Sequence, residues 1–476
     1  MSALQLAAND VRALSVGDMR VLFHVPSSSL FELDGLGAEL IDLVRDRGSV
    51  EEDTLRARFE GRYSPDEVVD TLREMMTLRV LEPVGTEPAA RAPVTVEELP
   101  VSTVVLNVNT GCNLSCSYCY KEDLATPAKG RRMDFATAAQ AVDLLLAEAA
   151  GRDRVNVVFF GGEPLSNMPL IRQVTDYAER RGRDTGKTID FSLTTNATLL
   201  TEELADWFQA HRFGITISMD GPPDLHDRNR RTVGGKGTYA VVAEKARMLL
   251  SRYTARPVGA RVTLTAGVTD VERIHAHLKE ELGFFEVGFS PVTSGDMAAF
   301  NLSGDELAEV FAGMKRLGRK YVDAALRGEN TGFGNMHQLM TDLSEGTSKS
   351  LPCGAGVGML AVDDRGDVNL CHRFTGSKMP TFGNVVTGWN KPAVREFVEA
   401  AANRTGIGCE TCWIRKLCAG GCYHEAYARY EDPLHPTVHY CDLMRDWVEF
   451  GLGAYTAIMR ENPEFFARHV APRRAH

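Results

Sequence analysis

Six short apolar segments recur between residues 103 and 290, with helical periodicity in the stretches between them. The segments are TVVLNV (103–108), VNVVFF (155–160), DFSLTT (190–195), GITISM (214–219), ARVTLT (260–265) and FEVGFS (285–290). Runs that are nearly continuous in apolar and β-branched residues are typical of parallel strands buried on both faces. FATAAQAVDLLLAEAA (135–150) is one of the intervening helical segments. We therefore predict an α/β fold over residues 101–344, a partial (β/α)6 barrel of TIM-like architecture.

The first 84 residues follow a different pattern. VRALSVGDMRVLFHVPSSSLFELD predicts short strands with turns at Gly17-Asp18 and Pro26-Ser27. A helix with Leu36, Leu40, Leu43 and Val44 on one face follows, then a short helix near 51–60. A third helix is predicted to begin after Ser64, with Pro65 in its first position and Glu67 in its first turn. Strands and three helices indicate a winged-helix module over 1–84, and the proline-containing segment 85–100 indicates a linker.

Composition and charge exclude several classes of function. The net charge is −11, and residues 11–84 hold nine Arg or Lys against fifteen Asp or Glu. An acidic surface is a poor match for phosphate, so we expect no nucleic-acid partner. No apolar run approaches the roughly 20 residues that span a bilayer, and MSALQLAAND lacks the features of a signal peptide. We expect a cytoplasmic protein with no membrane partner, in which ten cysteines indicate metal or redox chemistry rather than disulfides.

Three cysteines stand close together after the first barrel strand. GCNLSCSYCY (111–120) places Cys112, Cys116 and Cys119 in a C-x3-C-x2-C pattern. The carboxyl ends of barrel strands carry the chemistry of such folds. Three thiolates can hold an iron–sulfur cluster that has room for four ligands, which leaves one iron open. The alternative, a zinc knuckle or buried thiols, would usually supply a fourth Cys or His nearby, and the motif holds none.

This motif resembles that of the radical S-adenosylmethionine (radical SAM) enzymes. In that family three cysteines bind a [4Fe-4S] cluster, and S-adenosylmethionine chelates its fourth iron. Reduction releases a 5′-deoxyadenosyl radical that removes a hydrogen atom from the substrate. The resemblance implies that Cys112, Cys116 and Cys119 are catalytic cluster ligands and that Tyr118 lies near the adenine.

Further segments after the strands strengthen the resemblance. FFGGEP (159–164), TTNATLL (194–200) and SMDGP (218–222) follow strands two, three and four. The resemblance implies cofactor contacts for Gly161, Gly162, Glu163, Thr194, Asn196 and Ser218, and a cofactor or substrate-orienting role for Asp220. Asn196 and Asp220-Gly221 are equally typical of turns after strands, so both interpretations stay open. HDRNRR (226–231) is either an exposed basic loop or part of the site.

Seven more cysteines lie after residue 345. They are Cys353, Cys371, Cys409, Cys412, Cys418, Cys422 and Cys441. Their spacing resembles the SPASM domain, the twin-cluster extension of peptide-modifying radical enzymes, here predicted over 345–450 with a tail at 451–476. The resemblance implies a distal [4Fe-4S] cluster on Cys409, Cys412, Cys418 and Cys441, and a proximal one on Cys353, Cys371 and Cys422. With the cluster that binds S-adenosylmethionine, three clusters are expected.

Two departures bear on the reaction. Sulfatase-maturing relatives have an eighth cysteine in the gap that follows the position of Cys353, which this chain lacks. They also have an aspartate just after the position of Cys371, where this chain has His372. The proximal cluster therefore has an open position for water, another residue or a substrate thiolate. CHRF (371–374) is more similar to maturases that form thioethers, and His372 is a candidate base or a hydrogen-bond partner of the cluster.

The order of the three parts resembles that of peptide maturases. The first module is similar to PqqD-like recognition elements, which implies a small Cys-rich peptide or protein docked on it. The family suggested is the maturation enzyme of quinohemoprotein amine dehydrogenase, which links Cys sulfurs to Asp or Glu methylenes in the small subunit. An electron donor such as flavodoxin or ferredoxin is implied. Alternatives are maturation of six-cysteine peptides, anaerobic sulfatase-maturing oxidation of Cys or Ser, and a non-enzymatic iron–sulfur sensor.

Overall fold

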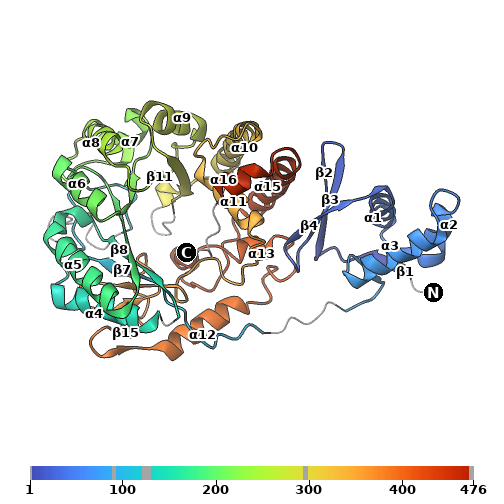
Figure 1. Cartoon of the computed structure of the whole chain (residues 1–476), viewed down its shortest axis with the longest axis horizontal. Helices are drawn as coiled ribbons and strands as arrows, with labels where there is room; N and C mark the ends of the chain where they lie inside the picture. The colour runs from blue at the N-terminus through green and yellow to red at the C-terminus, as the bar shows by residue number, and fades with distance from the viewer. Residues whose placement is uncertain (1–2, 88–92, 121–129, 150, 293–297, 471–476) are drawn as a thin grey trace.

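The six predicted strands form most of one eight-stranded sheet. The computed structural model describes residues 3–87, 93–120, 130–149, 151–292 and 298–470 (Figure 1). The strands are β7 (Thr103–Asn107), β8 (Arg154–Phe160), β9 (Thr188–Thr195), β10 (Gly214–Ser218), β11 (Val258–Leu264) and β12 (Glu286–Pro291). They are neighbours in chain order, and every adjacent pair is parallel. The predicted α/β class and parallel sheet are therefore confirmed.

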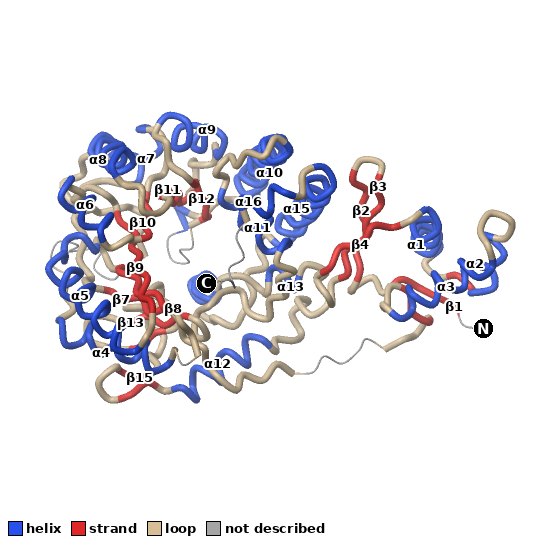
Figure 2. The backbone as a smooth tube through the Cα atoms, viewed as in Figure 1, coloured by secondary structure: helices blue, strands red, loops and turns tan. Residues whose placement is uncertain are grey.

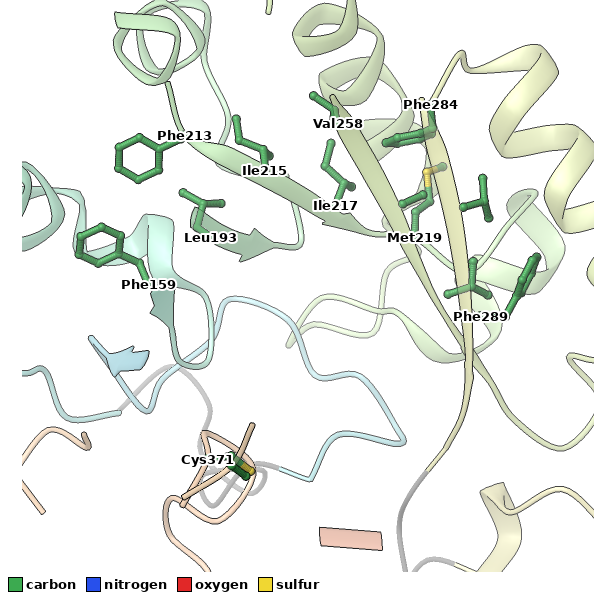
Figure 3. Packing of buried hydrophobic residues seen from close by; sticks show 14 of the residues in the cluster. Phe159, Leu193, Phe213, Ile215, Ile217, Met219, Val258, Phe284, Phe289 and Cys371 are labelled. Atoms are coloured by element: carbon green, nitrogen blue, oxygen red, sulfur yellow. The ribbon is translucent and has the colours of Figure 1, made fainter. Parts of the chain in front are cut away.

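Helices cover the outer face of this sheet, which Figure 2 shows as an arc of strands. They are α4 (Phe135–Glu148), α5 (Met168–Thr185), α6 (Glu202–Ala210), α7 (Pro223–Asn229), α8 (Tyr239–Arg252), α9 (Val271–Ala276), α10 (Gly304–Leu326) and α11 (Gly334–Ser344), with short turns η2 (Pro164–Asn167), η3 (His277–Glu281) and η4 (Ala298–Phe300). Phe159, Leu193, Ile215 and Ile217 belong to the buried apolar core (Figure 3). Burial of this face accounts for the placement of the helices.

The inner face of the sheet departs from the prediction that the strands are buried on both faces. In β10, Ile215 and Ile217 are buried, whereas Thr216 and Ser218 are half-buried and line a cavity. A strand with one face on a cavity alternates apolar and polar residues with a period of two. The alternation in GITIS is hard to see in the sequence, because the residues that face the cavity are the small Thr and Ser rather than charged residues.

The chain after residue 345 contributes to the barrel sheet, so it is not the separate unit that its cysteines suggest. β13 (Met359–Val362) pairs parallel with β7, and β14 (Val368–Asn369) pairs antiparallel with β13. Leu360 and Val362 are fully buried, so β13 both covers the open edge of β7 and extends the core. The remaining elements here are β15 (Gly383–Asn384), β16 (Gly388–Trp389), α12 (Lys391–Ala402), α13 (Arg415–Cys418) and α14 (Tyr423–Tyr430).

A long helix crosses the boundary predicted at residue 450. α15 (Cys441–Glu461) packs on α10 and α11, with Trp447, Leu452 and Ile458 buried. α16 (Glu464–His469) follows it, and only 471–476 of the predicted tail lie outside the described residues. Most of 451–476 is therefore helical, because its apolar positions have helical spacing.

The N-terminal module contains the predicted helices α1 (Gly35–Arg47), α2 (Glu52–Phe59) and α3 (Pro65–Thr77). Ser64 and Glu67 form the capping box that their spacing indicates. One sheet has the order β2 (Val11–Val16), β3 (Met19–His24), β4 (Ser29–Leu33), and a second sheet has the order β5 (Val50–Glu51), β1 (Ala3–Leu6), β6 (Leu81–Pro83). The strands and helices are thus present, and the winged-helix assignment stays a prediction.

The module is held against the C-terminal elements by both apolar and charged contacts. Phe23 meets the edge of Trp413, and Arg12 lies over the same indole ring while pairing with Glu449 at 2.6 Å. β2 packs on α15. In the linker, Val94 N–H donates to Asn403 at the end of α12, and Val96 N–H donates to Glu399 within α12. Residues 88–92 lie outside the described residues. No helix in the described part of the chain is long and apolar enough to cross a membrane.

Candidate functional site

A cavity of about 550 Å³ lies on the inner face of the sheet, near the carboxyl ends of its strands. Of the residues predicted for catalysis or cofactor binding, it is lined by Cys112, Cys116, Tyr118, Cys119, Gly161, Gly162, Glu163, Thr194, Asn196, Ser218 and His372. Asp220 lies directly behind this wall, hydrogen-bonded to Tyr118. The structure therefore brings segments from four different strands and from the C-terminal region to one place.

The loop with the first three cysteines is held by the segment 229–231. Ser115 N–H donates to the Arg231 carbonyl at 2.8 Å, and Ser117 N–H donates to the Asn229 carbonyl at 3.0 Å. The Ser117 hydroxyl also donates to Asn229 Oδ1 at 2.7 Å. HDRNRR is therefore part of the site rather than an exposed loop.

The environment of these thiols disfavours free thiolates. Burial raises the pKa of Cys112 to about 12 and the pKa of Cys116 to about 11. The nearby Arg230 guanidinium opposes the rise for Cys116, and coordination to a metal deprotonates a thiol outright. The set suits metal ligation and does not suit a free nucleophile.

Gly161 and Gly162 pass against the backbone of the cysteine loop. Gly161 has φ 142°, and a Cβ at either position would overlap residues 109–111. Gly162 N–H donates to the Asn109 carbonyl at 3.1 Å, and Glu163 N–H donates to the Gly111 carbonyl at 3.1 Å. Only glycine allows this close approach.

Gly162→Ala tests this contact. The added methyl group forces the loop that carries Cys112 to move, at a typical overpacking cost of about 1–3 kcal/mol. We expect a lower thermal midpoint and weaker S-adenosylmethionine binding, measured by thermal denaturation and equilibrium dialysis. Gly304→Ala is the matched control, because a Cβ there meets nothing within 4 Å. The same thermal midpoint and the same S-adenosylmethionine affinity in both variants would show that the contact between Gly162 and the cysteine loop is not important.

Glu163 is buried, and its carboxylate accepts hydrogen bonds from three groups of the protein. It accepts hydrogen bonds from Leu165 N–H (3.0 Å), the Thr195 hydroxyl (2.7 Å) and Asn196 N–H (2.8 Å). Burial raises the pKa of Glu163 to about 7, and these three hydrogen bonds oppose the rise. The side chain fixes the end of β9 beside the glycines.

The residues that follow β9 form a polar network next to Cys112. Asn196 Nδ2 donates to Asn113 Oδ1 at 2.9 Å, and the Thr198 hydroxyl donates to Asn196 Oδ1 at 2.6 Å. The network joins the cysteine loop to β9. Asn196 therefore stabilises the turn after β9 and also lines the cavity. Thr194 and Ser218 line the same cavity on β9 and β10.

Tyr118, Asp220 and Arg230 form a buried triad. The Tyr118 hydroxyl donates to Asp220 Oδ2 at 2.6 Å, and Arg230 Nε donates to the same oxygen at 2.8 Å. Asp220 Oδ1 accepts from Thr263 N–H at 3.0 Å, and Arg230 lies over the Tyr118 ring at 5.4 Å. Asp220 therefore positions the aromatic ring. Arg230 lines the cavity and was missed at the sequence level, although its motif HDRNRR was noted.

The seven C-terminal cysteines divide into two neighbourhoods. Burial raises the pKa of Cys409, and Cys418, Cys441 and Cys412 raise it further. Burial likewise raises the pKa of Cys371 to about 12, with added contributions from Cys422 and Cys353. The SPASM resemblance implies the same grouping, and cluster binding by the two groups stays a prediction. No three His, Cys, Asp or Glu side chains within the described ranges converge on a site for a single metal ion.

Tyr120 lies within electrostatic reach of thiols from the first cysteine group and from the proximal one. Burial raises its pKa, and the thiols of Cys119, Cys371 and Cys422 raise it further. The ring lies 5.4 Å from His424 and beneath the Arg373 guanidinium at 5.2 Å. Tyr120 and Arg373 line the cavity together with His372, whose ring is 4.2 Å from Phe160. One half-buried residue is thus near enough to thiols of both groups for their charges to act on it.

Comparisons with known proteins agree with this geometry. Residues 106–279 match the family model of the radical SAM superfamily. The chain is 24% identical over 370 residues to a cysteine-type anaerobic sulfatase-maturating enzyme of Clostridium perfringens, covering 74% of this chain and 96% of that protein. It is 26% identical over 354 residues to a serine-type enzyme of Klebsiella aerogenes, covering 71% and 82%. Residues 106–279 are therefore similar in sequence to the radical SAM superfamily.

Solved structures share the fold. One is native anSMEcpe with bound AdoMet, with a TM-score of 0.65 at 20% identity, covering 76% of this chain and all of that one. Another is Streptococcus suis SuiB bound to precursor peptide SuiA, with a TM-score of 0.50 at 15% identity, covering 91% and 98%. Residues 101–476 make up less than 91% of the chain, so the part that matches this structure must include some of the N-terminal module.

Proposed function

We propose that this chain is a radical SAM peptide maturase that joins cysteine sulfurs to side-chain methylene carbons in a small Cys-rich polypeptide. The carbons belong to Asp or Glu, and the candidate substrate is the small subunit of a quinohemoprotein amine dehydrogenase. The observation that carries the proposal is the lining of the cavity, which combines Cys112, Cys116 and Cys119 with His372 and Arg373 of the cysteine-rich region. Cys371, an expected ligand of the proximal cluster, directly precedes His372 in the chain.

The residues of the site fit the proposed cofactors. Cys112, Cys116 and Cys119 would hold the cluster that binds S-adenosylmethionine. Gly161 and Gly162 line the cavity beside the cysteine loop, where their backbone groups could bind the amino acid part of the cofactor. Thr194, Asn196 and Ser218 offer polar groups, and Tyr118 offers a fixed ring. The two C-terminal groups would hold the auxiliary clusters, giving three [4Fe-4S] clusters in all.

The reaction requires a hydrogen atom, a proton and an electron to leave the substrate. Bound S-adenosylmethionine and its cluster supply the radical that removes the hydrogen atom from a methylene. The new C–S bond also releases the thiol proton and one electron. His372 on the cavity wall is the candidate proton acceptor, and the seven C-terminal cysteines provide ligands for the electron acceptors. The first three cysteines and His372 line one cavity, and Cys371 directly precedes His372, which supplies the proximity that such a bond needs.

The N-terminal module has an edge suited to an extended peptide. β4 pairs only with β3 in the described sheet, and Phe31 and Glu32 in it are exposed. A peptide can add to such an edge as a further strand. We propose this edge as the docking site of the substrate, with flavodoxin or ferredoxin as the electron donor.

Anaerobic sulfatase maturation is the second candidate, because the Clostridium relative matches over 96% of its length. That reaction would oxidise a Cys or Ser without joining two residues. His372 and the three-cysteine proximal group distinguish this chain from the pattern of that class. Fragmentation of the product by mass spectrometry separates the two, since only a thioether keeps two parts of the peptide joined.

Cys353→Ala tests the proximal group. The cavity and the first three cysteines stay intact, so we expect 5′-deoxyadenosine to form while crosslinking falls to background. The measurement is chromatography of 5′-deoxyadenosine alongside the intact mass of the peptide. Full crosslinking by this variant would remove the proximal group from the mechanism.

A further inference from the structure

Two arginines that the mechanism above does not use share the wall of the cavity. Arg261 is in the middle of β11, paired in register with Ser218 of β10 and Gly288 of β12. Arg373 comes from the C-terminal region, two residues after Cys371. They reach the cavity from the barrel and from the cysteine-rich region respectively.

The sheet makes room for the Arg261 guanidinium. Gly259 and Gly288 line the cavity beside it, and a Cβ at Gly288 would lie 3.3 Å from Arg261 Nη1. Arg261 donates a hydrogen bond to the Ser290 hydroxyl, which is uncharged. It forms no ion pair with any residue in the described part of the chain, and its side chain is exposed to the cavity. Glu286 also lines this cavity and is the carboxylate whose charge acts on Arg261, but the two form no ion pair.

The charges around the two arginines leave the site positive. Burial lowers the pKa of Arg261, and the positive charge of Arg373 lowers it further, whereas Glu286 opposes both. Glu425 is the acid that acts on Arg373, but it also contacts Arg429 at 3.4 Å. Like charges in a cleft with low-dielectric walls attract an anion.

We propose that Arg261, together with Arg373, binds a carboxylate of the polypeptide substrate and thereby selects an acidic residue as the carbon partner of the crosslink. This rests on the proposed function and adds the residues that set its specificity. A guanidinium fits a carboxylate because its fork of N–H donors matches the two oxygens.

Arg261 lies beside the residues assigned to S-adenosylmethionine, because it is in register with Ser218. Those residues lie at or after the carboxyl ends of β8, β9 and β10. Arg261 precedes the last residue of β11 by three positions, and Thr263 stands between it and that end on the same face. A carboxylate held by Arg261 would therefore lie beside bound S-adenosylmethionine.

The test compares two synthetic peptides that differ only in one Asp replaced by Asn, each with one Cys. Binding of fluorescently labelled peptide to the reconstituted full chain with S-adenosylmethionine present is followed by anisotropy. We expect the Asp peptide to bind about tenfold or more tightly than its Asn twin, the effect of one charge-assisted hydrogen-bonded pair. Arg261→Gln should remove this preference, and Arg252→Gln, on the exposed face of α8, should keep it.

Equal affinity of the two peptides for the unaltered protein overturns the assignment, whether or not R261Q folds. A preference that persists in R261Q also overturns it. The two proposals fail separately: a carboxylate preference lost in R261Q, without any change in peptide mass on turnover, supports the arginine site and counts against thioether formation.

Discussion

Cys112→Ala is expected to abolish both cleavage of S-adenosylmethionine and modification of the peptide. The thiol lines the cavity with Cys116 and Cys119, and a cluster with two protein ligands has no fixed geometry toward the cofactor. The expected result is 5′-deoxyadenosine at background in an anaerobic assay with dithionite. Iron content should fall by one cluster of the expected three.

Cys441→Ala is the matched control for that experiment. Its thiol belongs to the distal group, as the shared effects on the pKa of Cys409 indicate, and does not line the cavity. Cleavage of S-adenosylmethionine should therefore persist. Retained cleavage by C112A would contradict the assignment of the first cysteine group.

Asp220→Asn is expected to give the largest loss of stability among single substitutions at the site. Asp220 and Arg230 are 1% and 9% exposed, and their ion pair is 2.8 Å long. The substitution leaves the Arg230 charge buried without its partner, which typically costs about 3–5 kcal/mol. We expect a clearly lower thermal midpoint and a displaced Tyr118, measured by thermal denaturation and by the near-ultraviolet spectrum.

Asp224→Asn provides the comparison, because Asp224 follows the same strand and also pairs with an arginine. Its partner Arg273 lies at 2.7 Å, but the two side chains are 57% and 50% exposed. Exposed pairs contribute about 0–1 kcal/mol, so this variant should unfold close to the unaltered protein. Similar losses in the two variants would show that Asp220 is not a buried anchor.

The sequence predicted the elements that have a strong local signal. The strands of the barrel are apolar runs followed by glycine, asparagine or aspartate turns, and each is present within a few residues of its predicted position. The third helix of the N-terminal module was visible because Ser64, Pro65 and Glu67 form a start signal that needs no tertiary contact.

Elements that depend on distant partners were not visible. β13 has only four residues, and its pairing with β7 joins positions more than 250 residues apart. The predicted boundary at residue 450 falls inside helix α15, whose apolar face packs on α10.

The candidate site was predicted best where a motif names the residue. Gly161, Gly162 and the first three cysteines were found in this way, and all of them line the cavity. Arg230, Tyr120 and Arg261 were missed because their roles come from three-dimensional neighbours. An arginine beside a glycine-lined strand face has no signature along the chain.

The central claim is that this chain forms thioether bonds in a small Cys-rich protein. The most direct measurement is the intact mass of the small subunit of a quinohemoprotein amine dehydrogenase, co-expressed anaerobically with the unaltered chain or with C112A. The account predicts a loss of two hydrogen atoms for each cysteine that no longer reacts with iodoacetamide, and no loss with C112A. An unchanged mass with every cysteine still reactive, while S-adenosylmethionine is cleaved, would contradict thioether formation on this substrate.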